Sequence, residues 1–216
     1  MEIINLGSQN SIFNQFIAEI RDETIQKDSM RFRRNCERLG EVFAYEISKK
    51  LDFESKEITT PLGTSTISLI KEQPILSTIL RAGLPLHQGL LNYFDKADNA
   101  FVSAYRRHHK NGTFDIELEY LASPDLTDRT IILSDPMLAS GASIVVTYKA
   151  LLQKGIPKKM HIVILIASSM GLDYVQRFLP ENTTIWVGAI DEELTAQSYI
   201  VPGLGDAGDL AFGSKE

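Results

Sequence analysis

The sequence of 216 residues predicts an α/β domain in which helices flank a parallel sheet. Short apolar runs recur through the second half of the chain, and stretches with helical character separate them. Apolar strands alternating with helices indicate a parallel sheet that is covered on both faces. The composition, 44% hydrophobic and 23% charged, is that of an ordinary globular protein of a length that can bury a sizeable core.

The first 55 residues are interpreted as an N-terminal helical arm that packs on the core or on another subunit. Apolar side chains recur at helical spacing after two serines, Ser11 and Ser29, which would begin the two helices. The residues concerned are Ile12, Phe16 and Ile20 in the first helix, and Phe32, Cys36, Leu39, Phe43 and Ile47 in the second. The basic run at 31–34 is interpreted as a solvated face of the second helix.

A hairpin and then five sheet strands are expected to follow the helices. Threonine-rich segments at 57–60 and 64–68 flank a Pro-Leu-Gly turn, which is typical of a hairpin. The sheet strands are predicted at 75–80, 100–105, 131–134, 162–167 and 184–187. The polar region 106–126 contains Asn-Gly and is interpreted as a flexible β-hairpin flap outside the sheet. Residues 199–216 are rich in glycine and are expected to be irregular.

Charge, apolar runs and cysteine usage exclude several classes of protein. The formal charge of −6 argues against a nucleic-acid partner, which needs a basic face. The longest apolar run, 162–167, is far shorter than the ~20 residues that cross a bilayer, so no membrane partner is expected. The single Cys36 excludes an internal disulfide or cysteine cluster and is expected in the core. We therefore expect a cytoplasmic protein.

The segment from Asp135 to Ser143 has the pattern of a phosphate-binding loop. A buried strand ends at Asp135, a loop of small residues follows, and a helix begins. Ligands of open α/β sheets bind beyond the carboxyl ends of the strands, where loop N–H groups and a helix N-terminus attract anions. The hydroxyls of Ser140 and Ser143 can also donate to a phosphate, and Asp135 can accept from sugar hydroxyls. The alternative is a plain strand-to-helix turn. The loop has neither a Walker A nor a dinucleotide-binding pattern.

Several segments resemble the uracil phosphoribosyltransferase family, in that family's order. Residues 135–143, Asp-Pro-Met-Leu-Ala-Ser-Gly-Ala-Ser, are similar to its phosphoribosyl pyrophosphate loop, usually Asp-Pro-Met-Leu-Ala-Thr-Gly-Gly-Ser. Residues 79–84 resemble its pyrophosphate loop, and Tyr105-Arg106 fits a Tyr-Arg pair at a strand end. Residues 199–209 resemble its uracil-binding segment, and residues 212–215 resemble its closing residues. The resemblance covers the chain from the second helix onward and implies a type I phosphoribosyltransferase fold.

The resemblance also implies an activity, in which uracil and phosphoribosyl pyrophosphate (PRPP) give UMP and diphosphate in pyrimidine salvage. The implied catalytic residues, which also contact PRPP, are Arg81, Arg106, Asp135 and Asp206. The remaining PRPP contacts are Pro136, Met137, Leu138, Ala139, Ser140, Gly141, Ala142 and Ser143. Uracil would be bound by Ile200, Gly205, Asp206 and Ala207. Mg²⁺ is expected to be held mainly through PRPP and water, with no direct protein ligand. GTP as an effector and a homodimer or larger oligomer are further expectations.

The sequence departs from the family pattern at a few positions. Ser140 keeps the hydroxyl of the usual threonine, but Ala142 replaces a glycine, which matters if that residue needs positive φ. Pro85, Gln88 and Leu210 also differ from the common residues. Three alternatives stay open: a transferase for another nucleobase, an RNA-binding pyrimidine regulator on the same fold, and a nucleotide-binding protein without turnover. The acidic charge disfavours the regulator. His108 and His109 are interpreted as a solvated pair in the flap.

Overall fold

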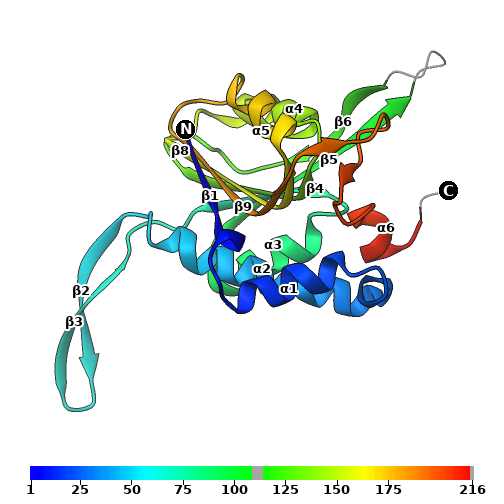
Figure 1. Cartoon of the computed structure of the whole chain (residues 1–216). Helices are drawn as coiled ribbons and strands as arrows, with labels where there is room; N and C mark the ends of the chain where they lie inside the picture. Colours follow the sequence, from blue (N-terminus) through cyan, green and yellow to red (C-terminus); the bar gives the residue numbers. More distant parts are fainter. Residues whose placement is uncertain (109–113, 215–216) are drawn as a thin grey trace.

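A seven-stranded sheet with strand order β1-β9-β8-β7-β4-β5-β6 forms the centre of the molecule (Figure 1). The computed structural model describes the backbone of residues 1–108 and 114–214. It describes their side chains too, except those of residues 104–118. The strands are β1 (Glu2–Asn5), β4 (Ile75–Leu80), β5 (Asp98–His108), β6 (Phe114–Ala122), β7 (Thr130–Leu138), β8 (Lys159–Ser168) and β9 (Thr183–Asp191). Neighbouring strands run parallel except β6, which is antiparallel to β5. The predicted α/β class is confirmed.

Helices cover both faces of this sheet, as the alternating pattern predicts (Figure 1). One face carries α1 (Ile12–Arg21), α2 (Ser29–Ser48), α3 (Leu84–Tyr93) and α6 (Ala207–Phe212), and the other carries α4 (Ala142–Leu151) and α5 (Ser169–Gln176). Short 3-10 turns lie at Leu6–Ser8 (η1), Ile25–Lys27 (η2) and Leu152–Lys154 (η3). None of the helices in the described residues is long and apolar enough to cross a membrane.

The two N-terminal helices form where the sequence predicts them, and they pack on the core, one of the two placements expected. All five predicted apolar residues of α2 are buried, including Cys36, whose burial raises the pKa of the thiol to about 12. In α1 the buried face is Phe13, Ile17 and Ile20, whereas Ile12 at the first position is 65% exposed. The Ser11 hydroxyl caps α1 as expected, and Asp28 rather than Ser29 caps α2.

Two glycines let α3 approach α2 closely. A Cβ at Gly40 would lie 2.4 Å from the Leu86 carbonyl oxygen, and one at Gly89 would lie 2.0 Å from the Glu37 carbonyl oxygen. Side chains at either position would force the helices apart. This contact matters for the site because α3 begins directly after the turn that carries Arg81.

The structure adds to one prediction about a segment and corrects two. The helices of residues 1–55 pack on the core, one of the two placements expected, and the same segment also contributes β1, which pairs with β9 in the sheet. The flap at 106–126 is not outside the sheet, because β5 continues to His108 and β6 pairs with it as the edge strand. Residues 199–216 are not wholly irregular, since they contain β11 (Ile200–Val201), paired with β10 (Glu193–Leu194), and helix α6.

The predicted hairpin is confirmed and is longer than expected. It comprises β2 (Phe53–Thr60) and β3 (Gly63–Ile70), which pair antiparallel with each other in a sheet of their own. The hairpin extends away from the rest of the molecule (Figure 1). Asn111-Gly112 and His109, which belong to the expected flap, lie outside the described residues.

Candidate active site

The two predicted phosphate-binding segments leave the sheet side by side. β4 and β7 are parallel neighbours, with Thr78 opposite Ser134 in the register. The Thr78 hydroxyl donates a hydrogen bond of 3.1 Å to the Ser134 carbonyl and joins the two strands near their carboxyl ends. The turn after β4 and the loop after β7 therefore emerge at the same edge of the sheet, where ligands of this architecture bind.

The predicted loop 135–143 is shorter in the structure. β7 continues to Leu138, so the connection to α4 consists of residues 139–141. Asp135 is thus inside the strand, 9% exposed, and not at its tip as predicted. Pro136 lacks an N–H and so cannot donate to the ladder. The ladder to β8 passes over it, pairing Asp135 with Ile164 and Met137 with Ile166.

The loop ends in a glycine that no other residue could easily replace. Gly141 precedes α4 with a left-handed φ of +81°. An added Cβ would lie 2.8 Å from the Val175 side chain and 3.0 Å from the Gly171 carbonyl oxygen. Ala142 is the first residue of α4 and is not among the described non-glycine residues with positive φ. The glycine that the family usually has at that position is therefore not required for the backbone here.

The first N–H groups of α4, at the end of this loop, have no partners within the helix. Helix α4 has ten residues, and its first turn includes Ser143. The Ser140 hydroxyl accepts a hydrogen bond of 3.4 Å from the Ala142 N–H. Backbone donors and the positive end of the helix dipole favour an anion at such a terminus.

Arg81 follows β4 and faces the C-terminal segment. The Leu80–Arg81 peptide bond is cis. The Arg81 Nη2 atom donates to Asp209 Oδ1 at 2.9 Å and to the Gly213 carbonyl oxygen at 2.6 Å. Its Nε atom is buried and has no hydrogen-bond partner among the described residues. Gly83 fits beneath this turn because a Cβ there would lie 2.1 Å from the Thr78 hydroxyl.

The predicted base-binding segment lies beside the Arg81 turn. Asp206 caps α6 by accepting a hydrogen bond of 2.9 Å from the Asp209 N–H. A Cβ at Gly208 would lie 3.8 Å from both Arg81 Nε and Ala82 Cβ, which shows how close the two segments are. Gly205 is exposed and has a φ of +93°. Ile200 and Ala207 are buried, and the Val201–Pro202 bond is cis.

Arg106 belongs to β5, and its side chain lies outside the described residues. The register pairs Leu80 at the end of β4 with Ser103, so the Arg106 backbone is three residues further along β5. Its role as a PRPP contact stays a prediction. His108 ends the same strand, and its expected solvation likewise stays a prediction.

Sequence reasoning assigned no role to four residues whose side chains connect the C-terminal segment with the rest of the molecule. They are Arg21, Asp191, Asp209 and Arg33. Arg33 donates to the Ala211 carbonyl oxygen at 2.6 Å, so the basic run at 31–34 is not simply a solvated face. The partners of Arg21 and Arg33 are 170 or more residues away along the chain, and no local pattern marks such pairs. The segment quoted for the family did contain Asp209, but its partner Arg81 was visible only in three dimensions.

The other departures from the family pattern have local explanations. Pro85 stands in the first turn of α3, where a missing N–H is tolerated. Gln88 is exposed and donates to Asn92. Leu210 packs against the core on the side of α1 and α2.

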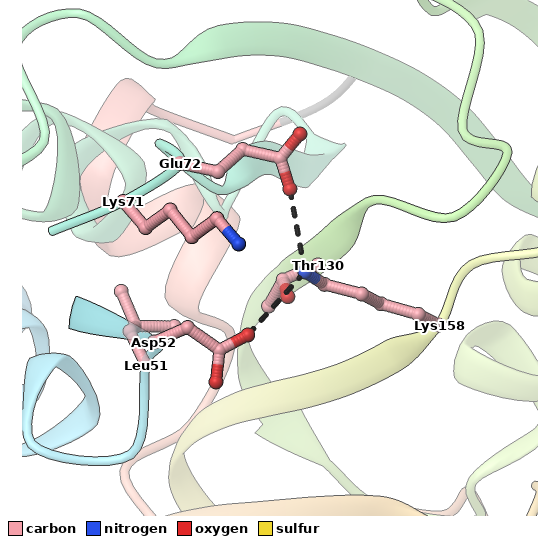
Figure 2. A pocket seen from close by; sticks show the side chains of 6 residues that line it. All are labelled: Leu51, Asp52, Lys71, Glu72, Thr130 and Lys158. Atoms are coloured by element: carbon pink, nitrogen blue, oxygen red, sulfur yellow. Dashed lines mark hydrogen bonds and ion pairs between the residues drawn. The ribbon is translucent and has the colours of Figure 1, made fainter. Parts of the chain in front are cut away.

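A cavity of about 390 Å³ lies at the opposite edge of the sheet (Figure 2). It is lined by Leu51, Asp52, Lys71, Glu72, Thr130 and Lys158, and Thr130 is the first residue of β7. Lys158 Nζ lies 3.5 Å from Asp52 and 3.4 Å from Glu72 (Figure 2). Because exposed Lys158 pairs with the two exposed carboxylates, the cavity is a surface salt-bridge cluster, and the candidate site is the other edge.

The described architecture is that of a type I phosphoribosyltransferase. A solved structure, "Structure of AQ2163 protein from Aquifex aeolicus", matches it with a TM-score of 0.86 and 28% identity, covering 98% of both chains. The family model for uracil phosphoribosyltransferase matches residues 8–214. A uracil phosphoribosyltransferase of Porphyromonas gingivalis is 57% identical over the whole of both chains, and one of Thermococcus gammatolerans is 37% identical over 93% of this chain and 88% of its own. The chain belongs to the uracil phosphoribosyltransferase family.

Proposed function

We propose that the chain performs its family's reaction at the carboxyl edge of the sheet, between the Arg81 turn, the N-terminus of α4 and the segment before α6. It is a uracil phosphoribosyltransferase, a pentosyltransferase whose reaction of uracil with PRPP gives UMP and diphosphate, consistent with pyrimidine salvage. One observation carries the assignment of the site. The turn after β4 adjoins both the strand that leads to the phosphate loop and the C-terminal segment.

The chemistry is a displacement at the anomeric carbon of ribose. The bond from this carbon to the pyrophosphate oxygen breaks, a bond to a uracil ring nitrogen forms, and that nitrogen loses its proton. The transition state should resemble an oxocarbenium ion, with negative charge growing on the departing pyrophosphate. Positioning of two substrates and stabilisation of that charge are therefore the main tasks of the protein. Arg81 and Arg106 suit the second task, since guanidinium groups grip phosphate oxygens.

The 5′-phosphate of PRPP is assigned to the loop at 139–141 and the first turn of α4. Support comes from the left-handed Gly141, which turns the chain so that successive N–H groups lead into the helix. Ser140 and Ser143 add hydroxyl donors. Asp135 keeps its proposed role as an acceptor for ribose hydroxyls, from a position inside β7.

Uracil is assigned to the main chain of Ile200, Gly205, Asp206 and Ala207. Main-chain donors and acceptors can match the alternating carbonyl and N–H groups on the edge of uracil. Cytosine would present an amino group where a carbonyl is expected, and a lost hydrogen bond in a dry site discriminates strongly. The exposed Gly205, with open space where a Cβ would be, leaves its backbone accessible to a base.

Mg²⁺ would neutralise part of the pyrophosphate charge. No group of three or more potential metal ligands exists among the described residues. The ion is proposed to be held mostly by PRPP oxygens and water. The carboxylate of Asp206, a hard oxygen donor at the start of α6, fits as an additional contact to that ion or its waters.

Three further properties belong to the same proposal. The exposed β2–β3 hairpin, with apolar side chains on an isolated two-stranded sheet, supports a homodimer or larger oligomer. GTP is proposed as an effector from the family resemblance, and rates measured with and without GTP test it. The single buried Cys36 is compatible with the reducing cytoplasm, the proposed location.

An activity measurement tests the proposed function directly. Purified protein is incubated with Mg²⁺, PRPP and each of uracil, cytosine, orotate, hypoxanthine and adenine, and products are separated by chromatography. We expect UMP from uracil and no nucleotide from the other bases. A nucleotide from another base alone would show a different transferase. Retention of RNA at physiological salt, without UMP formation, would favour the regulator.

A further inference from the structure

The N-terminal helix α1 reaches the base-binding segment through one side chain. Arg21 is the last residue of α1, and its guanidinium grips Asp191, the last residue of β9, through two hydrogen bonds of 2.8 Å. The same Nη1 atom donates to the Gly203 carbonyl oxygen at 3.0 Å. Asp191 Oδ2 in turn accepts from the Gly203 N–H at 2.9 Å. The Arg21–Asp191 pair therefore holds both hydrogen-bonding groups of Gly203.

Gly203 is a position where the backbone cannot easily shift. It is buried and has a φ of +56°, and a Cβ there would lie 2.1 Å from the Ile200 carbonyl oxygen. Leu204 is also buried, and next to it Gly205 is exposed with nothing within 4 Å of an added Cβ. Packing at Gly205 itself is thus sparse, so its place depends on the residues immediately before it.

A second side chain from the same region supports the segment. Gln26 of η2, with its amide oriented to donate, lies 2.8 Å from the Leu204 carbonyl oxygen and 3.1 Å from the Ile20 carbonyl oxygen. Two consecutive carbonyls, those of Gly203 and Leu204, are therefore bound by side chains of the N-terminal helical region. Neither contact involves the loop after β7 or the Arg81 turn.

The Arg21–Asp191 pair is well shielded from water. The side chains are 21% and 7% exposed. Burial alone would raise the pKa of Asp191, but hydrogen bonds from Arg21 and the Gly203 N–H outweigh it and keep the pKa below its usual value. Asp191 thus stays charged at neutral pH, and a bidentate pair of this kind fixes direction as well as distance.

We propose that Arg21 and Asp191 are positioning residues for base recognition, which hold Gly203 so that the backbone of residues 205–207 is presented to uracil. This inference rests on the proposed base site. Loss of the pair should let the segment shift, so uracil binding and discrimination against cytosine weaken. PRPP binding should change less than uracil binding, because the phosphate loop and α4 have no part in these contacts and only the proposed Asp206 contact to the pyrophosphate or its ion lies in the segment that shifts.

The test compares Arg21→Gln, Arg21→Lys and Asp191→Asn with a matched pair elsewhere. The matched pair is Arg31 of α2 and Glu19 of α1, joined by hydrogen bonds of 2.9 and 2.8 Å that Arg31 donates. The Glu19 side chain is 9% exposed. The Glu19 carboxylate also accepts hydrogen bonds from Gln15 and Asn35, neither of which belongs to the base segment. Arg31→Gln and Glu19→Gln therefore remove an equivalent pair that lies outside the site.

The measurements are KM for uracil, KM for PRPP, the ratio of UMP to CMP formed, and the melting temperature. We expect Arg21→Gln and Asp191→Asn to raise KM for uracil about tenfold or more, the factor typical of a lost charge-assisted hydrogen bond, with KM for PRPP within about threefold. Arg21→Lys should be intermediate. The control variants should melt earlier but keep both KM values.

Unchanged KM for uracil in a folded Arg21→Gln protein, or an equal rise in both KM values, would overturn the inference. Wild-type protein is assayed first, so absence of UMP there counts against the proposed function and not against the pair. If Arg21→Gln and Asp191→Asn do not fold, Arg21→Lys decides, since it keeps the charge and can keep one hydrogen bond.

Discussion

The guanidinium of Arg81 is shared between two tasks. Its Nη2 atom is bound by Asp209 and the Gly213 carbonyl, while its Nε atom is buried without a partner among the described residues. A buried donor without a hydrogen bond is unfavourable by about 1–3 kcal/mol. A pyrophosphate oxygen that accepts a hydrogen bond from Nε would remove this penalty. The Nη2 atom could meanwhile stay bound to Asp209 and the Gly213 carbonyl oxygen. In the proposed site, Arg81 would thereby couple the phosphate site to the base segment.

Replacement of Gly141 by alanine should impair PRPP binding as well as stability. The left-handed φ of +81° and the Cβ contact of 2.8 Å with Val175 both oppose a side chain, so the loop must move. We expect a loss of about 1–3 kcal/mol in the free energy of unfolding. Loop N–H groups that move lose their alignment with the 5′-phosphate, so we expect KM for PRPP to rise at least tenfold, the factor for about 1.4 kcal/mol of lost binding. Urea denaturation and steady-state kinetics measure the two effects.

Gly155→Ala is the control for Gly141→Ala. Gly155 has a φ of +123°, and a Cβ there would lie 2.5 Å from the Thr127 nitrogen, before β8 and far from the phosphate loop. It should therefore lose comparable stability while KM for PRPP keeps its wild-type value. An equal rise in KM in both variants would mean that Gly141 acts only through stability.

The contact between α1 and α2 contains a carboxylate that should make stability depend on acid pH. Hydrogen bonds from Arg31 and Asn35, against the opposing effect of burial, lower the pKa of Glu19 from 4.5 to about 2. A group with a lowered pKa in the folded state stabilises it above the unfolded pKa and loses this effect as pH falls. Glu19 should contribute about 2 kcal/mol at pH 7, declining between about pH 5 and pH 2.

The comparison of wild-type protein with Glu19→Gln isolates this carboxylate from the others that titrate in acid. The difference in free energy of unfolding between the two proteins, measured by urea denaturation from pH 7 to pH 3, should shrink as pH falls. A difference that is constant over this range would show that the charge of Glu19 contributes nothing and that only its shape matters.

Elements with local signals were predictable, and elements set by distant partners were not. The spacing of Phe32, Cys36 and Leu39 predicted α2 and its buried face, and β4 has the predicted bounds. By contrast, β7 continues through Pro136 because pairing with β8 overrides the preference of proline for strand ends. Strand β1 has only four residues and gains its stability from β9, at the far end of the chain.

The same limit applied to the candidate site. The loop after β7, the Arg81 turn and the base segment were predicted from motifs, because each is a contiguous run of residues. The Arg21–Asp191 pair was not, since its two members are separated by 170 residues and each is an ordinary surface residue type. Its role follows only from the contacts that each side chain makes with Gly203.

Viewed as a whole, the molecule keeps the proposed site and the β2–β3 hairpin in different places. The proposed site lies at the carboxyl edge of the sheet, and the hairpin projects from the body by itself (Figure 1). A lone two-stranded hairpin is marginal in water. Ile58, Ile67 and Leu69 point to one face of it and are 38%, 45% and 38% exposed. The same face carries the ion pair of Glu54 and Lys56, and the exposed apolar side chains beside it suit the proposed contact with a second copy of the chain.

A charge on the apolar face of the hairpin should therefore weaken self-association. Ile67 lies opposite Lys56 and Thr66 lies opposite Glu57, on the other face. Ile67→Glu and Thr66→Lys each place a charge across from its opposite, so neither should destabilise the hairpin itself. Light scattering coupled to gel filtration should give wild-type protein and Thr66→Lys at least twice the 24.1 kDa of one chain, and Ile67→Glu a smaller mass. A monomeric wild type, or an Ile67→Glu protein that keeps the wild-type mass, would remove this face from the proposed interface.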